Sequence, residues 1–217
     1  ARLAGVMTHA GSSYALSTPE ALAAMAEQER AGCVAAAERL RAAGHACETV
    51  SVGSTPTALS ARALDGVTEV RAGVYVFFDL VMAGIGVCTP DEIALSVLCT
   101  VIGHRPDARW IITDAGWMAM SRDRGTQKQA HDFGYGAVCD ADGRAIAELA
   151  FADANQEHGV LHWTGDAAVD LAQRFPLGTQ LRIVPNHACA TGAQHESYAV
   201  LPSTGEGLRR WPRFNGW

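Results

Sequence analysis

The sequence contains almost no lysine. Lys128 is the one lysine among 17 basic residues, so chemistry that needs an amine must use Lys128 or a residue from elsewhere. Acidic residues outnumber basic ones, which gives a formal net charge of −6, and the basic residues form no run. Nucleic acids and anionic membrane surfaces are therefore poor partners for this chain.

Long apolar runs and closely paired cysteines are also missing. No stretch reaches the roughly 18 to 20 apolar residues of a membrane span, and the N-terminus lacks the pattern of a signal peptide. The six cysteines include no C-x-x-C pair, which favours reduced thiols in a cytoplasmic protein. With 217 residues, 48% of them hydrophobic, the chain can bury a sizeable core.

Residues 1–84 alternate short apolar runs, glycine-bearing loops and helical segments. The expected elements are strands at 2–7, 47–53 and 67–73 and helices at about 19–43 and 56–63. This order predicts an α/β domain with parallel strands and polar loops at their carboxyl ends. Three such units are too few to close a TIM-type barrel, so we expect only part of one.

Residues 85–217 follow a different pattern, in which short strand-like runs are separated by turn signals such as "DADG" and "PLGT". The expected strands lie within 93–102, 109–116, 135–140, 145–151, 159–163 and 180–185. We therefore expect a β-rich C-terminal domain. Its last segment, 209–217, is expected to be a surface tail or a packing arm.

The segment "VPNHACAT" places His187 and Cys189 two residues apart. If the segment is extended, both side chains project from one face and can chelate a divalent ion. Two ligands are too few for structural zinc and leave room for water and substrate oxygens. The alternative is a core cysteine beside a hydrogen-bonded histidine. Glu157 and His158 in "NQEHG" could orient such ligands, or they could form an exposed turn.

Two glycine loops follow expected strands. In "GSTPT" (53–57), Gly53 permits a close approach of the backbone, and the amides and hydroxyls of Ser54 and Thr55 could hold a phosphate. In "RAGVY" (71–75), Gly73 and Tyr75 offer a second amide and a hydroxyl. Taken alone, "GSTPT" is more typical of an ordinary helix cap, whereas two adjacent loops of this kind build phosphate sites in barrels.

A third loop, "THAGSSY" (8–14), follows the first expected strand. Tyr14 at its end could stack on a planar cofactor or donate a hydrogen bond to it. The alternative is a loop tyrosine that packs on its own helix.

Together these segments resemble a known family. "THAGSSY", "GSTPT", "EVRAGVYVFFD", "DAGWMAMSRDRG", "NQEHG" and "PNHACAT" occur in this order in the D-threonine aldolase and D-serine dehydratase group. These are fold-type III pyridoxal phosphate enzymes related to alanine racemase. The resemblance covers nearly the whole chain, and "PNHACAT" with "GSTPT" is its most specific part.

The resemblance implies that 1–84 is the C-terminal part of a (β/α) barrel that binds the cofactor and that 85–217 is a β-rich domain that carries the metal. It implies that pyridoxal 5'-phosphate is bound by Tyr14, Gly53, Ser54, Thr55, Gly73 and Tyr75. It also implies that His187 and Cys189 hold a divalent metal. A thiolate ligand favours zinc, whereas manganese or magnesium suits a carboxylate better.

The resemblance also implies a partner segment. The lysine that carries the cofactor in this family lies near the end of the first barrel strand, and no position of this chain matches it. Lys128 is expected to be a surface lysine. We therefore expect the N-terminal half of the same enzyme as a partner, a complete enzyme that is a homodimer, and no catalytic lysine in this chain.

The implied activity is that of a lyase acting on a small D-3-hydroxy amino acid. Dehydration to a 2-oxo acid and ammonia is the first expectation, with D-serine, D-3-hydroxyaspartate or D-threonine as substrate. Retro-aldol cleavage to glycine and an aldehyde is the alternative. Racemisation would not need the metal, and a non-catalytic ligand- or metal-binding subunit would explain the missing lysine.

Overall fold

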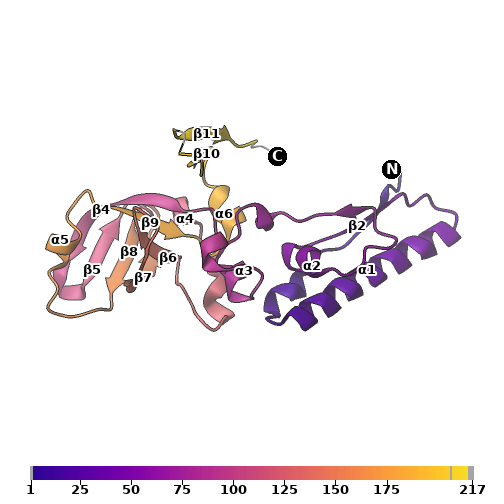
Figure 1. The fold of residues 1–217 in the computed structure, drawn as a ribbon, viewed down its shortest axis with the longest axis horizontal. Coiled ribbons are helices and arrows are strands. Elements are labelled where there is room, and N and C mark those ends of the chain that lie inside the picture. The colour runs from indigo at the N-terminus through magenta and orange to yellow at the C-terminus, as the bar shows by residue number, and fades with distance from the viewer. Residues whose placement is uncertain (1, 206, 215–217) are drawn as a thin grey trace. The chain divides into compact units, whose positions relative to one another are not determined.

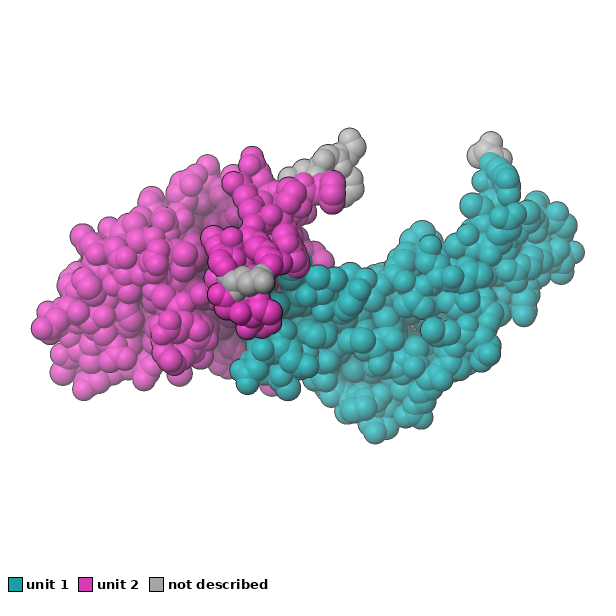
Figure 2. All heavy atoms as spheres, turned by 45° about the horizontal axis from the view of Figure 1, so that its top comes forward, with its two compact units in different colours: residues 1–94 teal, residues 95–217 magenta. Residues whose placement is uncertain are grey.

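The computed structural model describes residues 2–205 and 207–214. It divides the chain into two compact units, residues up to Ala94 and residues from Leu95 (Figure 2). The sequence predicts this boundary ten residues earlier, at 84, where the pattern changes to short strand-like runs. The intervening residues stay with the first unit, since the Ala94 amide donates to the Phe77 carbonyl at 2.7 Å.

The first unit is a three-stranded parallel sheet covered on one face by a long helix (Figure 1). Its strands, in spatial order, are β1 (Gly5–Met7), β2 (Thr49–Val52) and β3 (Glu69–Val70). The helices are α1 (Pro19–Ala42), α2 (Thr55–Ser60) and α3 (Leu80–Gly84), with short 3-10 turns at Gly11–Ala15, Val74–Val76 and Pro90–Glu92. The expected strand–helix order is confirmed, and the sheet of the described residues stays open.

Helix α1 begins and packs as its sequence predicts. The Thr18 hydroxyl accepts from the Ala21 amide at 3.2 Å, and Pro19 occupies the first turn, where no intrahelical amide is needed. Small side chains on the buried face, including Cys33 and Ala37, let the helix lie close to Val50 of β2. This contact is the apolar core of the unit.

The second unit is built on a closed antiparallel barrel in the strand order β4-β5-β8-β7-β6-β9. The strands are β4 (Val97–Arg105), β5 (Trp110–Thr113), β6 (Ala137–Asp140), β7 (Ala145–Ala154), β8 (Gly159–Trp163) and β9 (Gln180–Val184). All six correspond to the strand-like runs read from the sequence. Inward side chains such as Ile111, Phe151 and Ile183 fill the interior.

Short helices, 3-10 turns and a hairpin lie outside the barrel strands. The helices are α4 (Trp117–Met120), α5 (Leu171–Arg174) and α6 (Ala188–Gly192), with 3-10 turns at Pro106–Ala108 and Gly125–Lys128. The tail expected at 209–217 instead contributes β11 (Arg209–Pro212), which pairs with β10 (Ser197–Val200) in an antiparallel hairpin. Residues 215–217 of that segment lie outside the described residues. Among the described helices, none combines the length and apolar character needed to cross a bilayer.

Candidate functional site

The three loops singled out in the first unit all follow the carboxyl ends of neighbouring parallel strands. The Ser13 hydroxyl lies 3.2 Å from the Ser54 hydroxyl, which joins the loop after β1 to the loop after β2. The Tyr75 amide donates to the Thr55 hydroxyl at 3.2 Å, which joins the loop after β2 to the loop after β3. The expected convergence of these loops at one edge of the sheet is therefore present.

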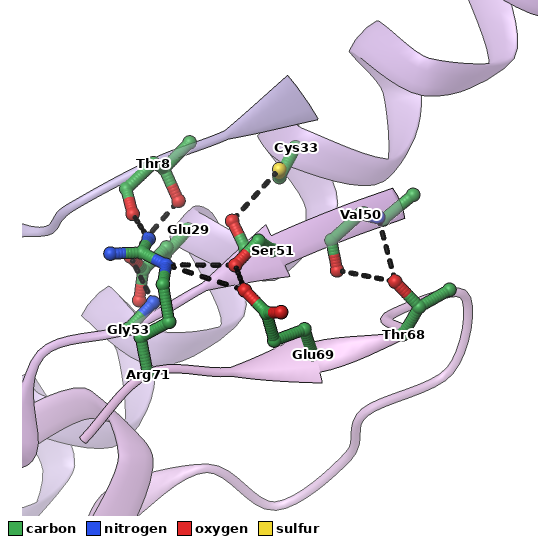
Figure 3. Close-up of polar contacts among 9 residues, drawn as sticks. All are labelled: Thr8, Glu29, Cys33, Val50, Ser51, Gly53, Thr68, Glu69 and Arg71. Atoms are coloured by element: carbon green, nitrogen blue, oxygen red, sulfur yellow. Dashed lines mark hydrogen bonds and ion pairs between the residues drawn. The ribbon is translucent and has the colours of Figure 1, made fainter. Parts of the chain in front are cut away.

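A buried carboxylate on α1 binds two of these loops and the start of α2. Glu29 accepts hydrogen bonds from the Thr8 hydroxyl (3.0 Å), the Gly53 amide (3.0 Å) and the Thr57 hydroxyl (2.7 Å), as Figure 3 shows for Thr8 and Gly53. Burial raises the pKa of Glu29, but these hydrogen bonds outweigh it and hold the pKa below its ordinary value. The carboxylate therefore stays ionised and acts as a common acceptor.

Arg71, directly after β3, ties the three strand ends together on the other face of the sheet. Its guanidinium donates to the Ser51 hydroxyl at 2.7 Å and to the Thr8 carbonyl (Figure 3). Ser51 in turn donates to Glu69, whose carboxylate also forms an ion pair with Arg71 at 3.9 Å. The position of each loop is thus set by polar contacts to a neighbouring strand.

The two loop glycines differ in how much space surrounds them. Gly53 has φ +150°, and a Cβ at this position would collide with the Arg71 carbonyl, so only glycine fits between β2 and β3. Its amide is also engaged by Glu29. At Gly73 an added Cβ would meet nothing within 4 Å, and the residue is exposed. An anion at this edge would therefore have open space at Gly73. It would not receive the amide of Gly53, which donates to Glu29.

The side chains predicted to bind a cofactor lie at different depths. Ser54 caps α2, and its hydroxyl accepts from the Thr57 amide at 3.3 Å, so it has the structural role that the helix-cap alternative predicted. Tyr75 is half-exposed. Tyr14 is partly buried in the 3-10 turn after β1, with its ring 6.0 Å from that of His9. The loop edge thus presents two tyrosine rings and an exposed glycine.

In the second unit, His187 and Cys189 are not on an extended segment. Strand β9 ends at Val184, His187 is the N-cap of α6, and Cys189 lies in the first turn of that helix. The expectation of a shared strand face is therefore wrong, because the chain bends at Asn186 and begins a helix. The two side chains still interact, and Cys189 is exposed.

The carboxylate of Asp123 orients the histidine. Its Oδ2 lies 2.6 Å from Nδ1 of His187, so Nε2 is the ring nitrogen that Asp123 does not engage. The hydrogen bond with Cys189 and that with Asp123 raise the pKa of His187 to about 9, against the opposing effect of burial. Since a metal needs the neutral ring, ion and proton compete for this imidazole.

Asn186 holds the Asp123 segment in place. It is buried, and its amide donates to the carbonyls of Gly134 (2.7 Å) and Asp123 (3.3 Å), while its oxygen accepts from the Thr126 hydroxyl at 3.2 Å. Asp123 and Asn186 were missed as functional candidates. Asp123 lies in "DAGWMAMSRDRG" and Asn186 in "PNHACAT". The one sequence signal for them was that both segments belong to the resemblance to the D-threonine aldolase and D-serine dehydratase group.

The turn "NQEHG" has a different role from the one proposed for it. The carbonyls of Asn155, Gln156 and Glu157 accept from the amides of Trp117, Met118 and Gly116, respectively, at 2.9 to 3.1 Å. Those carbonyls lie so close that a Cβ at position 116 would collide with them. The turn therefore caps α4, the helix that leads to Asp123.

The remaining predicted polar residues are exposed. The side chains of Glu157 and His158 are at the surface, and the orienting role considered for them belongs to Asp123. Lys128 lies exposed in the 3-10 turn Gly125–Lys128, in agreement with its interpretation as a surface lysine.

The donor set at α6 fits an ion with open coordination positions. Within residues 2–205 and 207–214, no group of three or more His, Cys, Asp or Glu side chains could hold a metal. The pair of His187 and Cys189 is therefore too small for a closed structural site and suits one completed by water or substrate oxygens.

Two family models match the chain in succession. Residues 1–81 match "Alanine racemase, N-terminal domain", and residues 94–201 match "Putative serine dehydratase domain". The chain is 66% identical over its whole length to D-threo-3-hydroxyaspartate dehydratase from Delftia sp. (strain HT23), of which it spans 57%. The solved structure of that enzyme superimposes on the chain with a TM-score of 0.91.

More distant relatives carry related names. A D-serine dehydratase from Dictyostelium discoideum is 30% identical over 206 residues, which cover 91% of this chain and 50% of that protein. A D-threonine aldolase from Arthrobacter sp. is 30% identical over 203 residues, covering 91% and 48%, respectively. Solved variants of the Delftia enzyme replace a histidine and a cysteine two positions apart by alanine, and the cysteine variant is described as metal-free.

Glu29 predicts a loss of stability in acid. Because its pKa is lowered in the folded state, its contribution is fully present above the ordinary pKa of 4.5 and is lost as the pH falls through the lower folded value. We expect Glu29→Gln to flatten the decline of the unfolding free energy below about pH 4.5, measured by urea unfolding of the full-length apoprotein. A difference between wild type and variant that is the same at every pH would contradict this.

Asp123 predicts an effect on metal affinity. Removing the carboxylate that orients His187 should weaken binding of a divalent ion by about 10- to 100-fold in Asp123→Ala, because the ring loses its fixed orientation. Competition with a chelator measures this without any activity assay. Asp142→Ala, which removes a carboxylate from the exposed turn between β6 and β7, is the control and should bind the ion as wild type does. Equal affinities in both variants would show that Asp123 does not position the ligand.

Proposed function

Because the chain belongs to the family of fold-type III pyridoxal phosphate enzymes that includes D-serine dehydratases and D-threonine aldolases, we propose that the whole protein is a lyase that dehydrates D-3-hydroxy amino acids. The observation that carries this proposal is the 66% identity, over the whole chain, to D-threo-3-hydroxyaspartate dehydratase. A small D-3-hydroxy acid such as D-threo-3-hydroxyaspartate is therefore the first substrate to test.

The edge formed by the loops after β1, β2 and β3 suits pyridoxal 5'-phosphate. The phosphate would lie at 53–55 and 73–75, where Gly73 leaves space, and the pyridine ring would lie beside Tyr14. When bound, this cofactor withdraws electrons from the α-carbon of an amino acid. The chain's own contribution is to set the distance between the loops through the contacts from Ser13 to Ser54 and from Thr55 to Tyr75.

His187 and Cys189 would hold a divalent ion, which would supply Lewis-acid polarisation of a substrate hydroxyl. The thiolate favours zinc over manganese or magnesium. Asp123 would keep the proton on Nδ1 of His187 and direct Nε2 to the ion. The histidine and cysteine two positions apart that were replaced in the Delftia structures, one of them in a metal-free form, have the spacing of this pair and support the assignment.

The cofactor lysine would come from the part of the whole protein that this chain does not span. The chain spans 57% of the length of the Delftia relative, and its one lysine is exposed in the second unit. The open edges of the three-stranded sheet suit completion of a barrel by further strands, which the N-terminal half of the enzyme would supply. The homodimeric state stays a prediction of the family resemblance.

The retro-aldol reaction is the second candidate, supported by the 30% identity to a D-threonine aldolase. Both reactions begin on the same substrate and differ in the bond that breaks. Dehydration breaks the bond between the β-carbon and the hydroxyl oxygen, whereas cleavage breaks the bond between the α- and β-carbons. The proposal favours dehydration because the identity to the dehydratase is 66% and that to the aldolase is 30%.

The products distinguish the two reactions. With D-threonine, we expect the metal-loaded full-length enzyme to release 2-oxobutyrate and ammonia in equal amounts, whereas retro-aldol cleavage would release glycine and acetaldehyde. Glycine as the main product would establish the aldolase reading. If D-threonine, D-serine and D-threo-3-hydroxyaspartate release neither a 2-oxo acid with ammonia nor glycine with an aldehyde, a non-catalytic binding role would be favoured.

Replacing the thiolate should change the preferred metal. We expect Cys189→Asp to shift relative affinity from zinc towards manganese, since a hard carboxylate replaces a soft ligand. Equilibrium dialysis with both ions present measures the ratio. Cys88→Ala, which removes a partly buried thiol of the first unit, serves as the control and should keep the wild-type ratio. An unchanged ratio in Cys189→Asp would remove Cys189 from the metal site.

A further inference from the structure

Glu29 is a buried carboxylate that the proposed reaction does not use. It is 8% exposed and lies in the middle of α1, on the side of the helix that faces the strand ends. Asp79, the other buried carboxylate in the first unit, caps α3 by accepting from the Met82 amide at 2.9 Å. Glu29 caps neither end of its own helix, because it lies between the cap residues Thr18 and Ala43.

The donors to Glu29 come from both sides of the proposed cofactor site. On the side of Tyr14, the loop after β1 supplies the Thr8 hydroxyl and a backbone hydrogen bond from Ala10. On the phosphate side, the loop after β2 supplies the Gly53 amide, and the first turn of α2 supplies the Thr57 hydroxyl. One carboxylate thus fixes the separation between the segment that would meet the ring and the segment that would meet the phosphate.

We propose that Glu29 is a positioning residue for the cofactor, which sets the spacing of the ring-side and phosphate-side loops without touching the cofactor itself. This inference rests on the proposed function, because it takes pyridoxal 5'-phosphate as the occupant of the loop edge. Loops that are already fixed need not be ordered when the ligand binds, so the affinity for the ligand is higher. Loss of Glu29 should therefore weaken cofactor binding more than loss of stability alone can explain.

Glu29 is not part of the apolar core that holds α1 to β2. Helix α1 packs against β2 through Cys33 and Ala37, one and two turns beyond Glu29. Val50, fully buried in β2, belongs to that core and to none of the three loops. Val50→Ala therefore provides a matched control that destabilises the unit through a cavity and leaves the Glu29 hydrogen bonds intact.

The acceptor geometry, rather than the charge, is what the loops use. In Glu29→Gln, one oxygen can still accept from the Gly53 amide and the Thr8 hydroxyl, and the new amide group can donate to the Thr57 hydroxyl, which is also an acceptor. In Glu29→Leu, a side chain of similar size removes the acceptor that Thr8, Ala10, Gly53 and Thr57 share. The two variants separate loss of charge from loss of loop spacing.

The test compares these variants in the full-length protein with bound pyridoxal 5'-phosphate. We expect Glu29→Leu to raise the dissociation constant of the cofactor at least about tenfold and to alter the visible absorbance of the cofactor that remains bound. Glu29→Gln should stay within about threefold of wild type. Val50→Ala should lower the unfolding midpoint of the apoprotein at least as much as Glu29→Leu does, yet keep the wild-type affinity and spectrum.

Each outcome decides the proposal. Equal cofactor affinity in Glu29→Leu and Val50→Ala would overturn the positioning role and leave the proposed function standing. A wild-type protein that does not bind pyridoxal 5'-phosphate would overturn the proposed function and the role of Glu29 with it. If Glu29→Leu does not fold, Thr8→Val removes the ring-side hydroxyl that donates to Glu29 and keeps the contact between Thr57 and Ser54. It should weaken the affinity in the same direction, and an unchanged affinity would overturn the positioning role.

Discussion

The first unit depends on one buried carboxylate that accepts from donors in separate segments. A parallel sheet delivers its loops to one edge, but it does not fix how far apart they lie, because the loops have no ladder hydrogen bonds of their own. Glu29 supplies that missing constraint from α1, and Arg71 supplies a second one from β3. The hydrophobic core holds the helix to the sheet, and the polar contacts hold the loops to the helix.

In the second unit, the backbone carbonyls of 155–157 and the side-chain amide of Asn186 fix the segments around His187. The turn at 155–157 caps α4, α4 leads to Asp123, and Asp123 meets the histidine at the start of α6. Asn186 closes this chain of contacts by bonding to both neighbouring segments. His187 and Cys189 are therefore held by elements that lie outside the barrel strands.

Periodicity and turn signals were enough to predict the barrel strands and the long helix, since those elements bury apolar side chains at regular intervals, as in β4, β5 and α1. The local geometry at His187 could not be predicted in this way, because a five-residue helix such as α6 has no period to detect. The partners Glu29 and Asp123 were invisible for another reason. Glu29 stands in an ordinary helical pattern and Asp123 in a polar loop, and only the tertiary fold brings them to residues 24 and 64 positions away.

The ring of strands in the second unit closes between its first and last members, because β4 pairs with β9, for example Val97 with Ile183. On a ribosome this seam cannot form until the chain has been synthesised through β9, and long-range pairings of this kind are slow to form. His187 follows β9 by three residues. His187 and Cys189 are therefore synthesised directly after the strand that lets the barrel close. A nascent chain exposes this imidazole and thiol together only once all six barrel strands have been made.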